Sequence, residues 1–394
     1  MADNSDSNKK IKVTLKVKSN ERVTIPPLGE VLLEKAAPGN DTGTTTTTIT
    51  NVHKGSDSGT DSDFDMWYFY SVFEMKFVLI VGDEEDPHIK GVCEVLKNNL
   101  QEYLILNPYN PSNSSISVEF EPFKVILGDS TREIYSDDVA AIWWRLKPKM
   151  IFEEKTMDEV EIEKFVTREW MGILSALEDF LEDKFWINPR SVDTKIRNKP
   201  YQLSIASSSG LKIPKGIITN NFARVMDLNS QHNPLIYKPL SYLIISSDHL
   251  ILYANLLSNE ELVAASQNIS RAPSIYQEYI EKDYELRITV IGEDIYPVKI
   301  YSQTNENTII DWRKDQLNLE YELVSLDPEF EESLKNLHNN FNLIYGAYDF
   351  IVTPEGEHVF LEVNPVGQWL WLEEELGLDI SQSIADLLSD ACKN

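Results

Sequence analysis

A glutamate and an asparagine stand two residues apart in the otherwise apolar run FLEVNPVGQWLWLEEEL, which extends from Phe360 to Leu376. The first five residues of this run predict a strand. Side chains alternate across a strand, so Glu362 and Asn364 should point to one face while Leu361 and Val363 face the opposite layer. A solvent-facing or edge position would be the ordinary alternative for Glu362. Two polar side chains on one face of an apolar strand instead suggest a ligand.

A third oxygen ligand is expected on the neighbouring strand. The run YGAYDFIV, residues 345–352, carries Asp349 and is joined to the first strand by the hairpin-like turn TPEGEH. Carboxylate and amide oxygens are the ligands that Mg²⁺ prefers, and this ion is usually shared between protein groups and substrate phosphates. The spacing therefore predicts a magnesium site of Asp349, Glu362 and Asn364.

Cations that could face phosphates come from separate segments. Lys238 in LIYKPL and Lys199 in IRNKPYQL stand in apolar or helix-start surroundings, where a buried lysine needs a partner. Each could instead be a surface lysine that covers apolar area with its stem. Arg287 in YELRITVIG and Arg313 in IIDWRKD complete the set, since arginine offers bidentate geometry to phosphate. The strand IYQEYI, residues 275–280, could read an adenine edge through its backbone.

Composition limits the function classes. The 394 residues include 64 acidic and 36 basic ones, for a formal net charge of −28, which argues against an electrostatic grip on nucleic acid or an anionic membrane. No signal peptide or membrane-spanning run is recognised. The two cysteines, Cys93 and Cys392, have no CxxC or Cys/His spacing, so neither a disulfide framework nor a zinc site is indicated. A cytoplasmic location is expected.

Common catalytic motifs are missing from the sequence. No G-x-x-x-x-G-K-[ST] and no G-x-G-x-x-G occurs, which disfavours a P-loop NTPase and a Rossmann dehydrogenase. The six histidines form no convincing Ser/His/Asp or Cys/His set. Chemistry that depends on positioning and electrostatics therefore fits better than acid–base chemistry.

The pattern along the chain predicts an arm followed by α/β and α+β domains. Residues 1–65 are rich in Thr, Ser, Asp and Gly, which is typical of a flexible arm or linker. The character changes at Met75, where MKFVLIVG predicts a buried strand. Further strands are expected over residues 116–120, 123–127, 140–146, 216–220, 234–240, 274–280, 285–292, 296–302 and 358–364. Helices are expected over residues 87–100, 158–183, 199–209, 328–342 and 380–391.

The order of these motifs resembles the ATP-grasp superfamily. The resemblance runs through NKPYQLSIASSSGLKIPKGIITN, IYKPL, QEYIEKDYELRITVIG, DWR, YDF and FLEVNPVGQWLWLE, and it covers residues 186–394. The details WWR, residues 143–145, and NPVGQWLWLE look like one branch, the graspetide synthetases or microviridin-type peptide ligases. With that branch the resemblance starts at Met75. It implies an α/β domain over residues 75–185 and two α+β subdomains, residues 186–274 and 275–394, that enclose the nucleotide.

Site roles follow from the resemblance, motif by motif. It implies ATP and Mg²⁺ as cofactors, with Asp349, Glu362 and Asn364 on the metal. The nucleotide would be held by Lys199 and Lys238 at the phosphates, by Gln277, Glu278, Tyr279 and Ile280 as the adenine hinge, and by Glu285 at the ribose. Arg287 and Arg313 would serve phosphate or acyl phosphate as catalytic groups. The segment SYLIISSDH after Lys238 lacks the glycines of many phosphate-covering loops, so no lid contacts are assigned there.

The resemblance also implies the reaction and the partner. A side-chain carboxylate of a ribosomal precursor peptide would be activated as an acyl phosphate and joined to a Thr or Ser hydroxyl, or a Lys amine, giving a macrocyclic ester or amide. The arm carries both reactants, in TGTTTTTIT and DSGTDSDFD, after the leader-like VTIPPLGEVLLEK. It is therefore interpreted either as a precursor fused in cis or as a solvated linker. A homodimer stays open.

Two other functions remain as alternatives. A ligase that adds a free amino acid to a protein or peptide would use the same superfamily fold, and its product would gain mass rather than lose water. A catalytically silent peptide-binding module would release no ADP when peptide is added. The combination of Asp349, Glu362 and Asn364 argues against the silent module.

Overall fold

A computed structural model describes residues 76–110, 112–147, 156–241 and 253–393, together with the backbone of six short strands. Two of these, β14 (Ile244–Ile245) and β15 (Leu250–Ile251), pair with each other. The chain divides into two compact units, residues 1–75 and 76–394. In the first unit β1 (Lys12–Thr14) pairs with β4 (Thr46–Thr48), and β2 (Arg22–Ile25) pairs with β3 (Gly29–Leu32). The rest of the expected arm lies outside the described residues.

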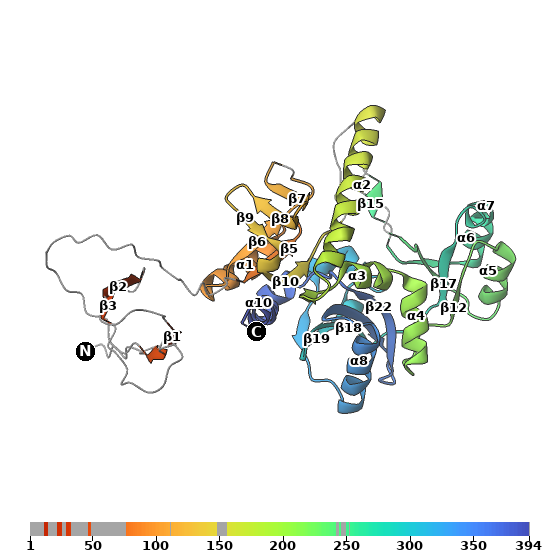
Figure 1. Ribbon diagram of the computed structural model, residues 1–394. Coiled ribbons are helices and arrows are strands. Elements are labelled where there is room, and N and C mark those ends of the chain that lie inside the picture. The colour runs from red at the N-terminus through yellow and green to blue at the C-terminus, as the bar shows by residue number, and fades with distance from the viewer. Residues whose placement is uncertain are drawn as a thin grey trace, which may run out of the picture. The chain divides into compact units, whose positions relative to one another are not determined.

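The second unit begins with a parallel sheet. Its strands are β5 (Phe77–Val81), β6 (Tyr103–Leu106), β10 (Val139–Trp144) and β11 (Phe185–Ile187), in the order β11-β10-β5-β6. Figure 1 labels β5, β6 and β10 of this sheet. Between β5 and β6 runs α1 (Pro87–Asn98), which is capped by Asp86 and starts with a proline. The four residues 78–81 are buried on both faces of the sheet, which explains the continuous apolar run in the sequence.

Each face of the parallel sheet is covered by different elements. On one face α1 packs with α10 (Ile380–Ala391), which comes from the end of the chain. On the other face lie α2 (Met157–Phe180) and the antiparallel sheet of β7 (Ser114–Phe120), β8 (Phe123–Asp129) and β9 (Glu133–Tyr135). The first α/β domain is thus closed by a helix from the C-terminal part of the sequence.

A smaller antiparallel sheet forms the central part. It contains β12 (Gly216–Thr219), β13 (Leu235–Lys238), β16 (Asn255–Leu257) and β17 (Ser274–Glu278), in the order β12-β17-β13-β16. The helices α5 (Phe222–Asn229), α6 (Asn259–Ala264) and α7 (Ser266–Ile269) pack on it through Val225, Leu262 and Ile269. β17 is hydrogen-bonded to both β12 and β13, so this sheet includes residues beyond 274, where the central subdomain is predicted to end. The predicted domain limits stay predictions.

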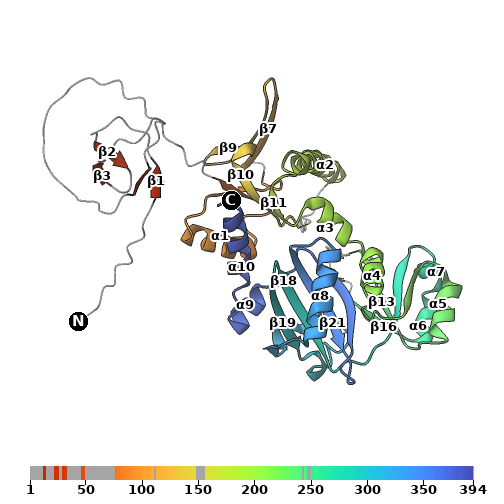
Figure 2. The ribbon, with the colours of Figure 1, turned by 60° about the horizontal axis from the view of Figure 1, so that its bottom comes forward.

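The C-terminal part is a five-stranded antiparallel sheet. Its order is β20-β19-β18-β21-β22, made of β18 (Tyr284–Ile291), β19 (Asp294–Ile300), β20 (Tyr321–Leu323), β21 (Tyr345–Val352) and β22 (His358–Asn364). The helices α3 (Arg190–Ile196), α4 (Lys199–Ser208) and α8 (Pro328–Asn340) cover one face (Figure 2). After β22 the chain enters α9 (Leu370–Leu376). On the opposite face, Ile291, Tyr345 and Ala347 pack in the core that includes α1 and α10, and the same face carries Arg287 and Asp349.

The expected elements are present, and the predicted fold class of α/β plus α+β is confirmed. The sequence pattern gives no separate prediction for α3, α5, α6, α7, α9 or the short strands β6, β9, β11, β16 and β20. Within the described residues, no helix combines the length and the apolar composition that crossing a membrane requires.

Candidate nucleotide and acyl-transfer site

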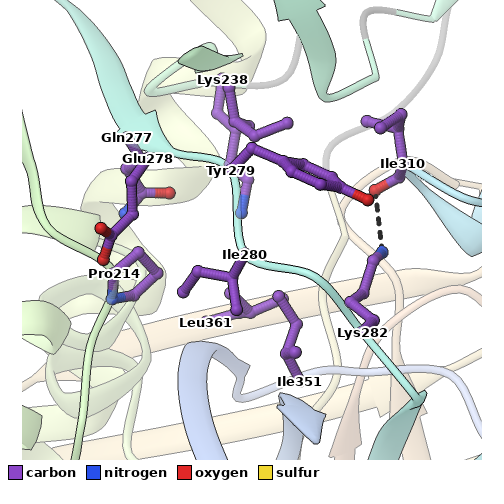
Figure 3. Close-up of a pocket in the computed structure, with 11 residues that line it drawn as sticks. Pro214, Lys238, Gln277, Glu278, Tyr279, Ile280, Lys282, Ile310, Ile351 and Leu361 are labelled. Atoms are coloured by element: carbon purple, nitrogen blue, oxygen red, sulfur yellow. Dashed lines mark hydrogen bonds between the residues drawn. The ribbon is translucent and has the colours of Figure 1, made fainter. Parts of the chain in front are cut away.

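A pocket lies between the central sheet and the C-terminal sheet. It is lined by Pro214, Ile236, Lys238, Gln277, Glu278, Tyr279, Ile280, Lys282, Ile310, Ile351 and Leu361 (Figure 3). The chain leaves β17 at Glu278 and crosses the pocket as an extended connection to β18. The Glu278 carboxylate accepts a hydrogen bond from the Lys215 backbone N–H at 2.9 Å, and its second oxygen lies 3.2 Å from His232. The apolar side chains that line the pocket around this crossing segment suit a flat heterocycle.

The four residues predicted as an adenine hinge all line this pocket, whereas Glu285 is absent from its lining. Glu285 is buried and accepts from Lys282 at 2.7 Å. Lys282 also donates to the Ile310 carbonyl at 3.2 Å, and it is Lys282 that reaches the pocket. Burial raises the pKa of Glu285, against the opposing charge of Lys282. The ribose role of Glu285 stays a prediction, and Lys282 is a pocket residue that the sequence reasoning missed.

The predicted acidic ligands stand opposite each other on paired strands. Asp349 of β21 faces Glu362 of β22, and Ala347 faces Asn364 two residues further along. A β-bulge follows, because Phe350 pairs with Phe360, so one extra residue, Leu361, is inserted in β22. The expectation that Leu361 faces the same layer as Val363 is therefore wrong. Val363 packs in the core, whereas Leu361 lines the pocket on the side of Glu362.

Basic side chains from two other segments meet Glu362. Lys199, the first residue of α4, lies 3.1 Å from its carboxylate, and Arg313 lies 3.4 Å from it. Arg313 is itself held by two hydrogen bonds to Asp311, at 2.8 and 2.7 Å. Burial works to raise the pKa of Glu362, but Lys199, Arg313 and Lys238 outweigh it and hold that pKa below its ordinary value. Glu362 is thus kept ionised.

Asp349 has a different partner and the opposite pKa shift. Arg287 of β18, the strand on its other side, donates to both carboxylate oxygens at 3.0 Å. Burial raises the pKa of Asp349 and outweighs Arg287, and the negative charge of Glu362 acts in the same direction. Asp349 and Glu362 are neighbouring carboxylates whose pKa values shift in opposite directions. A bound cation would stabilise the ionised form of both.

The donor set fits a magnesium ion that arrives with a nucleotide. Asp349 and Glu362 offer carboxylate oxygens on one face, and the exposed Asn364 lies on the same strand. The Asn364 side-chain oxygen accepts from the Val366 backbone N–H at 3.1 Å. Within the described parts of the chain, no three His, Cys, Asp or Glu side chains gather as a ready-made metal cage. Phosphate oxygens would have to complete the coordination, as they commonly do for this ion.

Lys238 lies between the pocket and the charged residues around Glu362. It lines the pocket at the end of β13, and its pKa is affected by Glu362, Lys199, Arg313 and Asp311. Burial lowers the pKa of Lys238, and the two neighbouring cations lower it further against the opposing carboxylates. An anion bound next to this half-buried lysine would stabilise its charged form.

The structure brings most of the predicted residues together. Lys238 and the four hinge residues line the pocket. The charged cluster consists of Glu362 with Lys199 and Arg313, and of Asp349 with Arg287 on the neighbouring strands. Sequence reasoning missed Lys282, Asp311 and the apolar lining of Ile236, Ile310, Ile351 and Leu361. Asp311 had one available signal, because it caps the short helical segment that carries Arg313.

A hinge pocket between two α+β sheets, beside an acidic pair ringed by lysine and arginine, defines the ATP-grasp class of fold. A comparison with protein-family models found no match. Among solved structures, a RiPP-associated ATP-grasp ligase from Chryseobacterium gregarium is 30% identical with a TM-score of 0.70, over 80% of this chain and 97% of that one. The macrocyclase MdnC from Microcystis aeruginosa MRC is 26% identical with a TM-score of 0.69, over 80% and 99%. The chain belongs to the graspetide synthetase branch of the ATP-grasp ligases.

A curated relative extends the comparison to another kind of ligase. The alpha-aminoadipate–LysW ligase LysX of Sulfurisphaera tokodaii is 26% identical over 193 residues, which are 46% of this chain. The match spans 64% of that relative's length.

Proposed function

We propose that the protein is an ATP-dependent peptide ligase. It would activate Asp or Glu side-chain carboxylates of a precursor peptide and join them to Thr or Ser hydroxyls, or Lys amines, in macrocyclic links. The observation that carries the proposal is the acidic pair Asp349 and Glu362, set between Arg287, Arg313 and Lys199 and adjoining the hinge pocket. Such a face can hold a triphosphate and an incoming carboxylate at once.

The reaction would proceed in two displacements. The peptide carboxylate attacks the γ-phosphorus of ATP, the bond to ADP breaks, and an acyl phosphate forms. A hydroxyl or amine then attacks the carbonyl carbon, phosphate leaves, and the nucleophile releases its proton. Each link formed removes the elements of one water from the peptide. In both displacements catalysis is mainly positioning and charge stabilisation.

Residues of this chain would have separate tasks. Lys199 and Lys238 would neutralise phosphate charge, and Arg287 and Arg313 would face the transferring phosphoryl group or the acyl phosphate. Asp349, Glu362 and Asn364 would hold Mg²⁺. When bound, this ion neutralises the phosphate oxygens during transfer. The backbone of residues 277–280 would bind adenine, and Glu285 would bind the ribose, directly or through Lys282.

The relatives support a peptide substrate. The Chryseobacterium ligase was solved in complex with ADP and a leader and core peptide, and MdnC was solved with the precursor peptide MdnA. We propose that residues 1–65 of this chain are such a precursor, fused in cis. A tether would keep the threonine and aspartate tracts at roughly millimolar effective concentration near the site.

The buried Cys93 and the half-buried Cys392 are both free thiols, in keeping with a reducing cytoplasm.

Intact-mass measurement with Mg·ATP tests the proposal. Incubation of the full chain should release ADP and remove one water per link, and fragmentation should place the links within residues 1–65. A chain shortened by those residues should dehydrate them when they are supplied as a separate peptide. If it ignores that peptide but dehydrates another, the arm is a linker. Light scattering on the same samples distinguishes a monomer from a homodimer.

A second candidate function is the addition of a free amino acid to a protein or peptide, which the similarity to LysX favours. Its product would gain the mass of an amino-acid residue instead of losing water. ATP hydrolysis without any change in peptide mass would disagree with both ligase functions, and a lack of ADP release in the presence of peptide would favour a silent binding module.

A further inference from the structure

The carboxyl ends of β5, β10 and β11 form the edge of the parallel sheet where α/β proteins usually bind ligands. In this protein a loop of the chain itself, Pro365–Trp369, is held at that edge. Asn188, directly after β11, donates to the Pro365 carbonyl at 3.2 Å. Arg145, directly after β10, donates to the carbonyls of Val366 and Gly367 at 3.5 and 3.2 Å. The sheet edge therefore serves to hold a loop that directly follows the strand of Glu362.

The C-terminal end of the same loop, at Trp369, is held by α1, the helix that follows β5. His88, at the start of α1, accepts a hydrogen bond from the Trp369 backbone N–H at 3.2 Å through Nε2. Because Nε2 is an acceptor, the proton of the neutral ring lies on Nδ1, which donates to Asp86 at 2.7 Å. Burial lowers the pKa of His88 to about 4, so the ring is neutral at physiological pH.

Asp86 connects the two contacts with the loop. Its carboxylate accepts from Arg145 at 3.2 Å and lies 2.8 Å from Lys147, in addition to the bond from His88. Arg145 is 2% exposed, and its guanidinium lies 4.3 Å from the Trp369 ring centroid. A buried cation with a carboxylate, two carbonyls and an aromatic face around it has little freedom to move.

The opposite side of the loop touches the charged cluster of the site. Arg287 donates to the Gln368 carbonyl at 3.3 Å, and the same guanidinium binds Asp349. Gly367 lies so close that a Cβ built there would stand 2.8 Å from the Arg287 guanidinium and 2.4 Å from the Ala347 side chain. A displacement of the loop would thus be transmitted to Arg287.

We propose that Arg145 is a positioning residue for the acyl-transfer site. With Asp86 and His88 it fixes the loop Pro365–Trp369, and through the Gln368 carbonyl it sets the position of Arg287 relative to Asp349. The α/β domain then acts as a scaffold for the catalytic face of a different sheet. This inference rests on the proposed function, because it assigns Arg287 to the reacting groups.

Arg145→Lys is the first test, since lysine keeps the charge but cannot reach Asp86 and two carbonyls together. We expect kcat for ADP release to fall about 10- to 100-fold, because small misplacements of catalytic groups cost rate on this scale. The KM for ATP and the affinity for ADP should stay within about twofold of the wild type, since the hinge pocket makes no use of this loop. Arg132→Lys is the matched control. Arg132 lies in the same domain, where it binds Glu102 and the Tyr103 carbonyl.

Gly367→Ala should give the same split between kcat and KM with Arg145 intact. Since both changes act through Arg287, the double variant should be less impaired than the product of the two single effects predicts. A kcat unchanged in Arg145→Lys, or an equal loss in kcat and in ADP affinity, would overturn the inference.

Hydrogen exchange separates this inference from the proposed function. Arg145→Lys should speed amide exchange of residues 366–369 and leave residues 277–280 unchanged, whether or not a productive peptide has been found. Unchanged exchange in residues 366–369 would refute the positioning role at once. A wild-type protein that binds ADP but never releases it from ATP would refute the proposed function, and the exchange result would still decide whether Arg145 holds the loop.

Discussion

The two ends of the candidate site differ in composition although the same strands reach both. At one end Ile236, Ile280, Ile310, Ile351 and Leu361 form the apolar part of the hinge pocket, which we call the apolar end. At the other, the charged end, Lys199, Arg287, Arg313, Asp349 and Glu362 are joined in ion pairs. On β21, Asp349 and Ile351 are two residues apart and belong to opposite ends. A distance of two residues along one strand thus separates groups suited to a base from groups suited to phosphates.

This difference predicts different kinds of loss on mutation. A side chain at the charged end acts on developing charge, so its removal should lower kcat. A side chain at the apolar end contributes contact area in the ground state and the transition state alike, so its removal should lower affinity. Lys238 lies between the two ends and should affect binding through charge.

Glu362→Gln should have the largest effect. Glutamine keeps the size but loses the charge that faces Lys199, Arg313 and the proposed magnesium ion, and we expect kcat to fall about 10²- to 10³-fold. ADP affinity should not fall, because the released cations can pair with phosphate. Titration of ADP release against Mg²⁺ measures the effect. Glu357→Gln is the matched control, since Glu357 lies near the same hairpin but pairs with Lys212 at the surface. An active variant with unchanged magnesium dependence would remove the metal assignment.

The sequence was more informative about the charged end than about the apolar end. Glu362 and Asp349 were recognised because an acidic residue within a buried strand is unusual and needs a partner. Ile351 and Leu361 gave no such signal, because aliphatic residues in strands are ordinary core residues. The bulge that turns Leu361 toward the pocket depends on the pairing of two strands, which alternation within one strand cannot reveal. The roles assigned to the charged residues stay predictions.

The same limit applies to the α/β domain. The alternation and the apolar runs predicted its strands, and the motif WWR was noticed only as a resemblance. The contact of Arg145 with Gly367 joins residues 222 positions apart. Such a contact depends on how α10 and β22 return to the first domain, and no local pattern contains that information.

Lys238→Ala should have the second largest effect, on binding. A phosphate that loses a desolvated cationic partner should bind more weakly by about 2–5 kcal/mol. Calorimetry with ADP gives the affinity, and Lys212→Ala is a matched control because the Lys212 side chain is half exposed and pairs with the surface residue Glu357. Unaltered ADP affinity would place Lys238 outside the phosphate contacts and would leave Lys199 and the arginines as the cations that bind phosphate.

Leu361→Ala should have the smallest effect and tests the bulge directly. The shortened side chain removes apolar contact from the hinge pocket, for which we expect a loss of about 1 kcal/mol in ADP binding, equivalent to a few-fold change in affinity. The kcat at saturating ATP should remain that of the wild type, in contrast to Glu362→Gln at the adjacent position. Leu323→Ala is the control, since Leu323 is exposed on β20 of the same sheet and does not line the pocket.

If Leu361 instead faced the core beside Val363, as simple alternation predicts, its truncation would cost about 2–5 kcal/mol of folding stability and leave ADP affinity unchanged. Thermal unfolding and calorimetry on the same variant therefore distinguish a pocket residue from a core residue.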